Sequence, residues 1–121
     1  ELVANGDFTE AGGYVAMQRL LPARPDAVFA ASDQLALGAW RAIREAGLRV
    51  PEDLALVGFD DLLPPDTGRP RLTTIRQPVV RSGSEAVNVL IDIIDNGLTP
   101  PRRVILDTQL VIRESCGAVM R

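Results

Sequence analysis

Two adjacent carboxylates, Asp60 and Asp61, end a run of apolar and small residues in the stretch LALVGFDDLLPPD at positions 54–66. Carboxylates in this position could act in acid–base catalysis, bind a metal ion, accept hydrogen bonds from a ligand, or close a backbone turn. Adjacent side chains at a strand end diverge, and no lysine or third clustered carboxylate supports phosphoryl chemistry. We therefore expect neither a metal site nor a catalytic pair.

The composition removes most residues that enzymes use for catalysis. All 13 basic residues are arginine, and histidine is absent. This excludes histidine bases, Ser-His and Cys-His pairs, Schiff-base lysines and the P-loop lysine. The sequence predicts a protein that is not an enzyme and that needs no cofactor.

Net charge and cysteine content limit the partners and the cellular location that the sequence allows. The net charge of the 121 residues is -3 with no basic cluster, so any DNA contact must come from residues outside this stretch. Cys116 is the single cysteine, which excludes an internal disulfide and fits a reducing compartment. No apolar run approaches the length of a membrane span, and no signal peptide is recognisable. We expect a segment of a longer cytoplasmic protein without membrane contact.

The hydrophobic pattern alternates between helix and strand. Apolar residues at helical spacing predict a helix that Thr9 caps, a helix opening at Ser32-Asp33, and a third from Ser82. Short apolar or β-branched runs predict strands, of which 27–31 is expected to be buried on both sides. The predicted strands are 27–31, 54–59, 72–76 and one or two within 102–115. This order predicts an α/β fold with a mostly parallel sheet flanked by helices.

In open parallel sheets, ligands bind outside the carboxyl ends of the strands. Ser32 and Asp33 follow one predicted strand, Asp60 and Asp61 the next, and Gln77 a third. Helix capping alone would explain Asp33, and Ser32 could cap or contact a ligand. No helix follows Asp60, so its carboxylate needs the backbone amides of a turn, an arginine or ligand hydroxyls as partners. Asp61 is interpreted as a turn or capping residue.

Two aromatic residues are further candidates for a binding or packing role. Phe8 precedes the first helix in a predicted loop, where its ring could stack on a sugar or a base or could pack beneath the helix. Trp40 lies inside the second helix, where packing or an interface is the simpler interpretation.

Several separate motifs together resemble LacI-type bacterial transcription regulators, the family of the lactose and purine repressors. They are, in order, NGDFTEAGGYVAMQRLL, DAVFAASDQLALGAWRAIREAGLRVPEDLALVGFDD, PRLTTIRQP and LVIRES. The resemblance covers nearly the whole chain. It implies the carboxyl-terminal part of a two-lobed effector domain of the periplasmic-binding-protein type (type I), without the N-terminal DNA-binding domain.

The resemblance also implies an arrangement of lobes. Residues 1–76 and 101–121 would belong to the second lobe, and 77–100 would form a crossover segment of the first lobe. The chain would supply one wall of the effector cleft. Homodimerisation would use the second lobe through Leu37 and the loop residues Thr67, Gly68 and Arg69.

Residue roles carry over by position. Phe8 matches the aromatic that stacks on the effector, Asp60 the carboxylate that hydrogen-bonds it, and Asp33 the helix-start aspartate. Ser32 matches a position that commonly holds asparagine, so its shorter side chain implies a different contact. Gln77 is expected to line the cleft at the crossover.

The resemblance implies an effector-binding, sugar- or metabolite-sensing part of an allosteric DNA-binding repressor. The partners would be a small-molecule effector, operator DNA through the N-terminal domain, and a second copy in a homodimer. A periplasmic sugar-binding protein of a transport system shares this fold class and stays open as the alternative.

Overall fold

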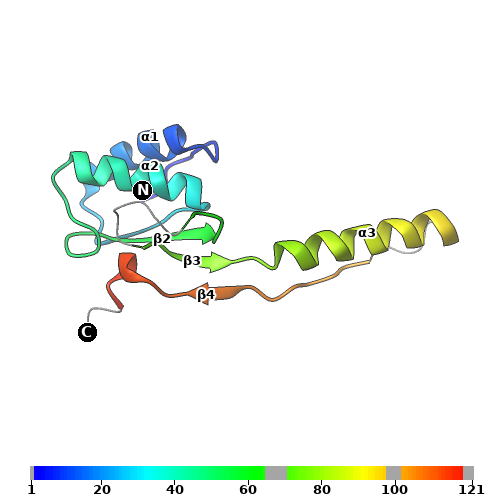
Figure 1. The fold of residues 1–121 in the computed structure, drawn as a ribbon. Helices are drawn as coiled ribbons and strands as arrows, with labels where there is room; N and C mark the ends of the chain where they lie inside the picture. The colour runs from blue at the N-terminus through cyan, green and yellow to red at the C-terminus, as the bar shows by residue number, and fades with distance from the viewer. Residues whose placement is uncertain (1, 65–70, 98–101, 119–121) are drawn as a thin grey trace. The chain divides into compact units, whose positions relative to one another are not determined.

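A computed structural model describes residues 2–64, 71–97 and 102–118, and it divides the chain into two compact units (Figure 1). Unit 1 combines Glu1–Arg76 with Leu110–Arg121, and unit 2 is Gln77–Gln109. The elements in chain order are α1 Glu10–Leu20, η1 Leu21–Ala23, β1 Ala27–Phe29, α2 Asp33–Glu45, β2 Ala55–Asp60, β3 Thr73–Arg76, α3 Val79–Asn96, β4 Gln109–Val111 and η2 Glu114–Cys116.

A four-stranded sheet in the order β1-β2-β3-β4 forms the centre of unit 1. The first three strands run parallel, with Phe29 opposite Val57 and Asp60 opposite Arg76. The short β4 adjoins β3, and Figure 1 shows it running in the opposite direction. This mixed, mostly parallel sheet with flanking helices confirms the predicted α/β class.

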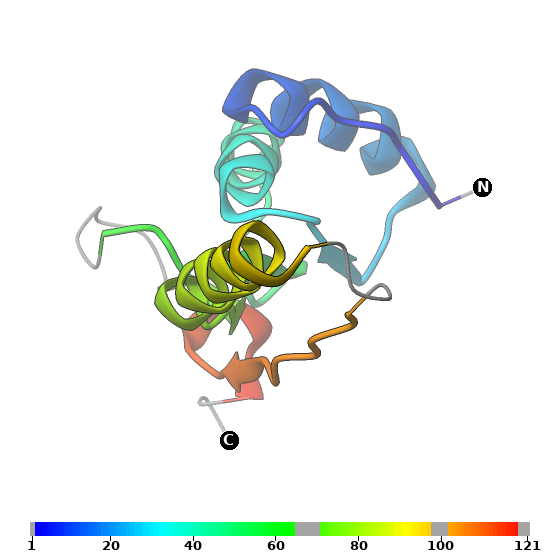
Figure 2. The same ribbon diagram turned by 90° about the vertical axis from the view of Figure 1, so that its right-hand side faces the viewer.

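Helices α1 and α2 lie side by side over the sheet (Figure 2). The Thr9 hydroxyl accepts a hydrogen bond from the amide of Gly12 and so caps α1 as predicted. In α2, the residues Ala39, Ala42 and Ile43 of the predicted stripe are buried and face the core. Sequence periodicity therefore located both helices correctly.

Two glycines set how closely the helices approach. A Cβ atom on Gly38 of α2 would collide with the backbone of Glu10 and Tyr14 in α1, and one on Gly13 would collide with the backbone of Leu35. Because each collision is with main-chain atoms, side-chain rotation cannot relieve it. The α1–α2 contact thus requires glycine at both positions.

The 27–31 segment contains the predicted strand, but the expectation that it is buried on both sides was wrong. Strand β1 is only three residues long and lies at the edge of the sheet, so Phe29 is 59% exposed instead of buried on both sides. Phe29 packs edge-to-face against Phe59 of β2, with ring centroids 6.5 Å apart. No described element covers that face of β1.

Unit 2 consists of α3 and the chain that follows it. The helix begins at Val79, three residues before the predicted start at Ser82, because Pro78 serves as its N-cap residue. The predicted helical stripe is present, but its large residues are at least half exposed among the described residues; these are Val87, Leu90, Ile91 and Ile94. Arg102, in the segment that follows α3 in the chain, forms an ion pair with Asp92 of α3 at 2.9 Å.

Candidate functional site

The end of β2 has an unusual backbone. Asp60 has φ 111° and Asp61 has φ 59°, values that residues with a Cβ atom adopt at a cost. Among the described residues, the other non-glycine positions with positive φ are Phe8 and Arg24. Three of these four were candidate site residues in the sequence. Backbone strain of this kind persists only where surrounding contacts hold it.

Asp61 is held by two arginines. Its Oδ2 accepts a hydrogen bond from Arg76 Nε and its Oδ1 accepts one from Arg113 Nη2, both at 2.6 Å. The Asp61 side chain is 8% exposed. Burial raises the pKa of Asp61, but the hydrogen bonds from Arg113 and Arg76 outweigh burial, so the pKa lies below its ordinary value. Asp61 is therefore an ionised group that joins three segments of unit 1.

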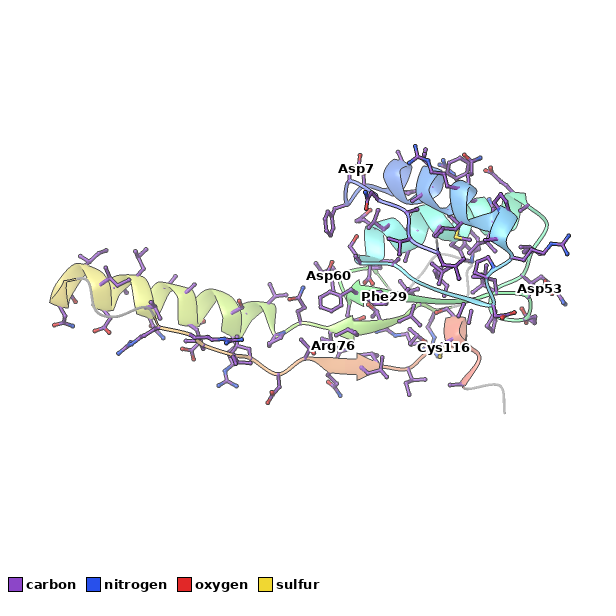
Figure 3. All side chains as sticks on the ribbon, turned by 180° about the vertical axis from the view of Figure 1, so that it is seen from behind. Asp7, Phe29, Asp53, Asp60, Arg76 and Cys116 are labelled. Carbon is purple, nitrogen blue, oxygen red and sulfur yellow. The ribbon has the colours of Figure 1, made fainter. Side chains whose placement is uncertain are left out.

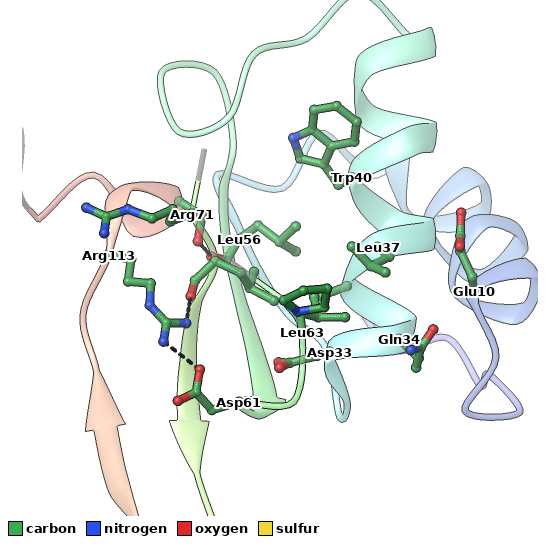
Figure 4. Close-up of a pocket in the computed structure, with 14 residues that line it drawn as sticks. Glu10, Asp33, Gln34, Leu37, Trp40, Leu56, Asp61, Leu63, Arg71 and Arg113 are labelled. Carbon is green, nitrogen blue, oxygen red and sulfur yellow. Dashed lines mark hydrogen bonds and ion pairs between the residues drawn. The ribbon is translucent and has the colours of Figure 1, made fainter. Parts of the chain in front are cut away.

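Arg113 reaches Asp61 from the segment between β4 and η2 (Figure 4). Its second guanidinium nitrogen donates to the carbonyl of Leu72 at 2.8 Å. Sequence analysis did not select Arg113 or Arg76. The only available signal was that arginine is the sole cation in the chain and that LVIRES contains Arg113.

Asp33 lies buried between α2 and the sheet. Its Oδ1 accepts a hydrogen bond from Thr74 Oγ1 of β3 at 2.6 Å, and its Oδ2 accepts one from the backbone amide of Leu62 at 3.1 Å. Burial raises the pKa of Asp33; its two hydrogen bonds offset part of that rise, and the charges of Asp60 and Asp61 add to it. The carboxylate connects α2, β3 and the turn after β2.

Asp33 was predicted to be a capping or structural residue, and of the two residues that could cap α2 it is Ser32 that does so. The Ser32 hydroxyl accepts the amide hydrogen of Leu35 at 3.2 Å, while Asp33 is the first residue of the helix. Asp33 is structural in a different way, through its two tertiary hydrogen bonds. A hydroxyl that accepts one hydrogen bond still has a proton to donate, so the Ser32 cap is compatible with an effector contact.

Phe8 is 65% exposed and follows Asp7, whose carboxylate accepts hydrogen bonds from the amide and hydroxyl of Thr9. Figure 3 shows Asp7 and Asp60 at the same end of unit 1, with Asp53 at the other end. The Phe8 ring is thus not part of the hydrophobic core.

The structure brings only some of the candidate residues together. Asp33, Asp60 and Asp61 form one cluster at the end of β2. Gln77 is exposed and begins unit 2. Thr67, Gly68 and Arg69 lie outside the described residues.

A hollow of about 650 Å³ lies beside α2 and the residues after β2 (Figure 4). Its lining includes half-buried Leu37 and Trp40 of α2, together with Asp61, Arg71 and Arg113. Leu37 is a predicted dimer residue, and none of the four predicted effector contacts lines this hollow. The hollow is lined instead by Asp33 and Asp61 of the cluster at the end of β2.

The described residues offer neither a metal-binding cluster nor a membrane-spanning helix. Within residues 2–64, 71–97 and 102–118, no group of three or more Cys, Asp or Glu side chains could hold a metal ion. In the same ranges, no helix has the length and apolar character to cross a membrane.

Comparison with known proteins identifies relatives over nearly the whole chain. Residues 1–116 match the family described as periplasmic binding protein-like domain. The HTH-type transcriptional regulator CelR of Thermobifida fusca is 46% identical over 116 residues, which are 94% of this chain and 34% of that protein. The repressor PurR of Escherichia coli is 42% identical over 115 residues, covering 93% of this chain and 34% of its own length. The chain thus spans about a third of the length of these relatives.

Solved structures agree with the sequence relatives. A transcriptional regulator CelR–cellobiose complex superposes with a TM-score of 0.85 at 45% identity, covering 91% of this chain and 34% of that one. The lac repressor dimer bound to operator and the anti-inducer ONPF gives a TM-score of 0.81 at 34% identity, with coverages of 92% and 34%. At these identities, both the fold and the sequence pattern are shared.

Proposed function

Because the chain belongs to the periplasmic binding protein-like domain family, in the form found in LacI-type transcription regulators, we propose that it supplies the effector-binding and dimerisation part of a ligand-responsive DNA-binding regulator. The effector would be a sugar or a related small metabolite. The relatives described above are regulators, which favours this proposal over a periplasmic transport protein. The proposal assigns binding to the site, without turnover, and a cytoplasmic location.

The observation that carries the proposal is the geometry at Asp60. Asp60 ends β2 with an unfavourable φ, and hydrogen bonds and ion pairs on the next two residues hold that turn. A carboxylate fixed in this way suits acceptance of hydrogen bonds from ligand hydroxyls. An exposed ring such as Phe8, which follows Asp7 at the same end of unit 1 as Asp60, suits the apolar face of a sugar. Neither contact requires histidine or lysine.

Ser32 and Gln77 complete the proposed effector contacts. Ser32 stands at the start of α2 and Gln77 directly after β3, so both follow carboxyl ends of parallel strands. The cellobiose complex of CelR makes cellobiose a suitable first probe.

Homodimerisation is proposed through the α2 side of unit 1. Leu37 and Trp40 are half-buried and line the 650 Å³ hollow, so partly exposed apolar surface is available there. The loop positions Thr67, Gly68 and Arg69 belong to the same proposed interface on the strength of the family resemblance. The dimeric state of the lac repressor structure supports this assignment.

The proposed mechanism is a population shift between two arrangements of the lobes. An effector that binds one arrangement more tightly moves the population toward it by the difference in binding free energy. Operator DNA would be contacted by an N-terminal domain outside this chain, and dimerisation would make the spacing of two such domains depend on the effector.

Effector binding tests the site directly. In the protein that carries this chain, Asp60→Ala and Phe8→Ala should each weaken cellobiose binding roughly ten- to a hundredfold, since each removes a main contact with the ligand. Isothermal titration calorimetry measures the change. Asp53→Ala is the matched control, because Asp53 is ion-paired with Arg49 at the far end of unit 1. Unchanged affinity in both site variants would refute the assignment.

A further inference from the structure

The buried carboxylate of Asp33 makes two tertiary hydrogen bonds that helix formation does not need. Ser32 already caps α2, so the helix start is satisfied without the Asp33 side chain. Asp33 is 3% exposed, and burial together with the charges of Asp60 and Asp61 raises its pKa. A buried carboxylate costs free energy unless its hydrogen bonds are well made. The partners of these two hydrogen bonds therefore indicate which part of the structure Asp33 holds in place.

One of the two bonds ends on the turn that carries Asp60. Asp33 Oδ2 accepts the amide hydrogen of Leu62, two residues after Asp60. The intervening Asp61 is held from the other side by Arg76 and Arg113. The turn that contains the two consecutive residues with positive φ is thus held at its second and third residues.

The other bond fixes Asp33 itself. Thr74 Oγ1 of β3 donates to Asp33 Oδ1 at 2.6 Å, and both residues are almost fully buried. Gly58 of β2 leaves the space for this carboxylate, because a Cβ atom there would lie 2.5 Å from Asp33 Oδ1. The strands β2 and β3 therefore fix the position of the Asp33 carboxylate, independently of its contact with Leu62.

We propose that Asp33 is a positioning residue, which holds Leu62 and thereby fixes the direction in which Asp60 presents its carboxylate to the effector. This rests on the proposed effector role of Asp60. Asp33 is only 3% exposed and both of its carboxylate oxygens are already hydrogen-bonded, so it acts through the turn rather than by touching the ligand.

A double-mutant cycle in the protein that carries this chain tests the proposal. Asp33→Ala should weaken cellobiose binding about tenfold when Asp60 is present, as expected for a displaced charged acceptor. In the Asp60→Ala background the same change should leave affinity unaltered. Titrations are made at a temperature where every variant is folded by circular dichroism. An equal loss of affinity in both backgrounds, or no loss in either, would overturn the proposal.

Two further variants separate positioning from general stability. Asp33→Asn should restore most of the affinity, because the amide oxygen can accept from Leu62 while its nitrogen donates to the Thr74 hydroxyl. Ser115→Ala is the control, since Ser115 is equally buried and its hydroxyl bridges Leu56 and Thr73. It should lower stability and leave affinity unchanged. A loss of affinity in Ser115→Ala equal to that in Asp33→Ala would contradict positioning.

Hydrogen exchange measured without ligand tests the role of Asp33 separately from the proposed effector. In Asp33→Ala, the Leu62 amide should exchange with deuterium faster, because its acceptor is gone. The Ala30 amide, bonded to the carbonyl of Val57, should keep its protection. If wild type fails to bind cellobiose, the proposed effector fails, and exchange at Leu62 still decides whether Asp33 holds the turn. Unchanged exchange at Leu62 would refute the inference.

Discussion

Replacing Asp61 with alanine is expected to lower the free energy of unfolding by about 3 kcal/mol, because the change leaves two arginines without their shared carboxylate. The value lies at the low end for a broken buried pair, since Arg76 is half-exposed and water can solvate it. Urea unfolding at pH 7, followed by circular dichroism, measures the loss. Asp53→Ala, which breaks an exposed ion pair with Arg49, should change the midpoint only slightly. Equal losses in the two variants would contradict the role assigned to burial.

The stabilisation by Asp61 has an expected pH dependence. The pKa of Asp61 is lower in the folded chain than its ordinary value of 3.8, so the unfolded state binds its proton at the higher pH. The stabilisation is fully present above pH 3.8 and is lost as the pH falls through the lower folded value. The difference in stability between wild type and Asp61→Asn should therefore be constant near neutrality and shrink in acid. A difference that grew on acidification would contradict the ion pairs.

Replacing Gly38 with alanine is expected to cost about 2 kcal/mol or more. The new methyl group would overlap main-chain atoms of Glu10 and Tyr14, so α1 must move away from α2. The higher helix propensity of alanine returns only about 1 kcal/mol. Thermal unfolding of the protein that carries this chain measures the net loss.

Gly83→Ala is the matched control for Gly38→Ala. Both glycines lie inside helices, but a Cβ atom on Gly83 in α3 meets nothing within 4 Å. Propensity alone should then raise stability by about 0.5–1 kcal/mol. A similar destabilisation at both positions would show that close packing of the two helices is not the cause.

Local sequence pattern was sufficient to predict the helices and the fold class. Apolar spacing and capping residues located α1 and α2, because both depend on interactions within a few residues of the chain. The start of α3 was displaced because its N-cap residue is Pro78, which has no side-chain capping bond. The exposure of Phe29 could not be predicted, since it depends on what lies beside an edge strand.

The strand-end rule predicted which carboxylates lie together but not which residues they contact. It placed Asp33, Asp60 and Asp61 together because carboxyl ends of parallel strands meet at one edge. The ion pair between Asp61 and Arg113 joins residues that are 52 positions apart in the chain, and a pattern of neighbouring residues cannot reveal such a contact. Asp33, which could have capped α2, instead bonds to Thr74 and Leu62, which lie 41 and 29 positions away. The effector roles of Phe8, Ser32, Asp60 and Gln77 remain predictions that binding experiments will decide.

The positive φ of Asp60 places two selective pressures in opposition at one residue. Glycine adopts φ 111° without the penalty that a Cβ atom carries, so a search for heat-resistant variants should favour Asp60→Gly. The same substitution deletes the carboxylate proposed to recognise the effector. Libraries screened for thermal tolerance alone would thus be expected to accumulate regulators that fold well and no longer respond, whereas screens for response should retain aspartate at this position.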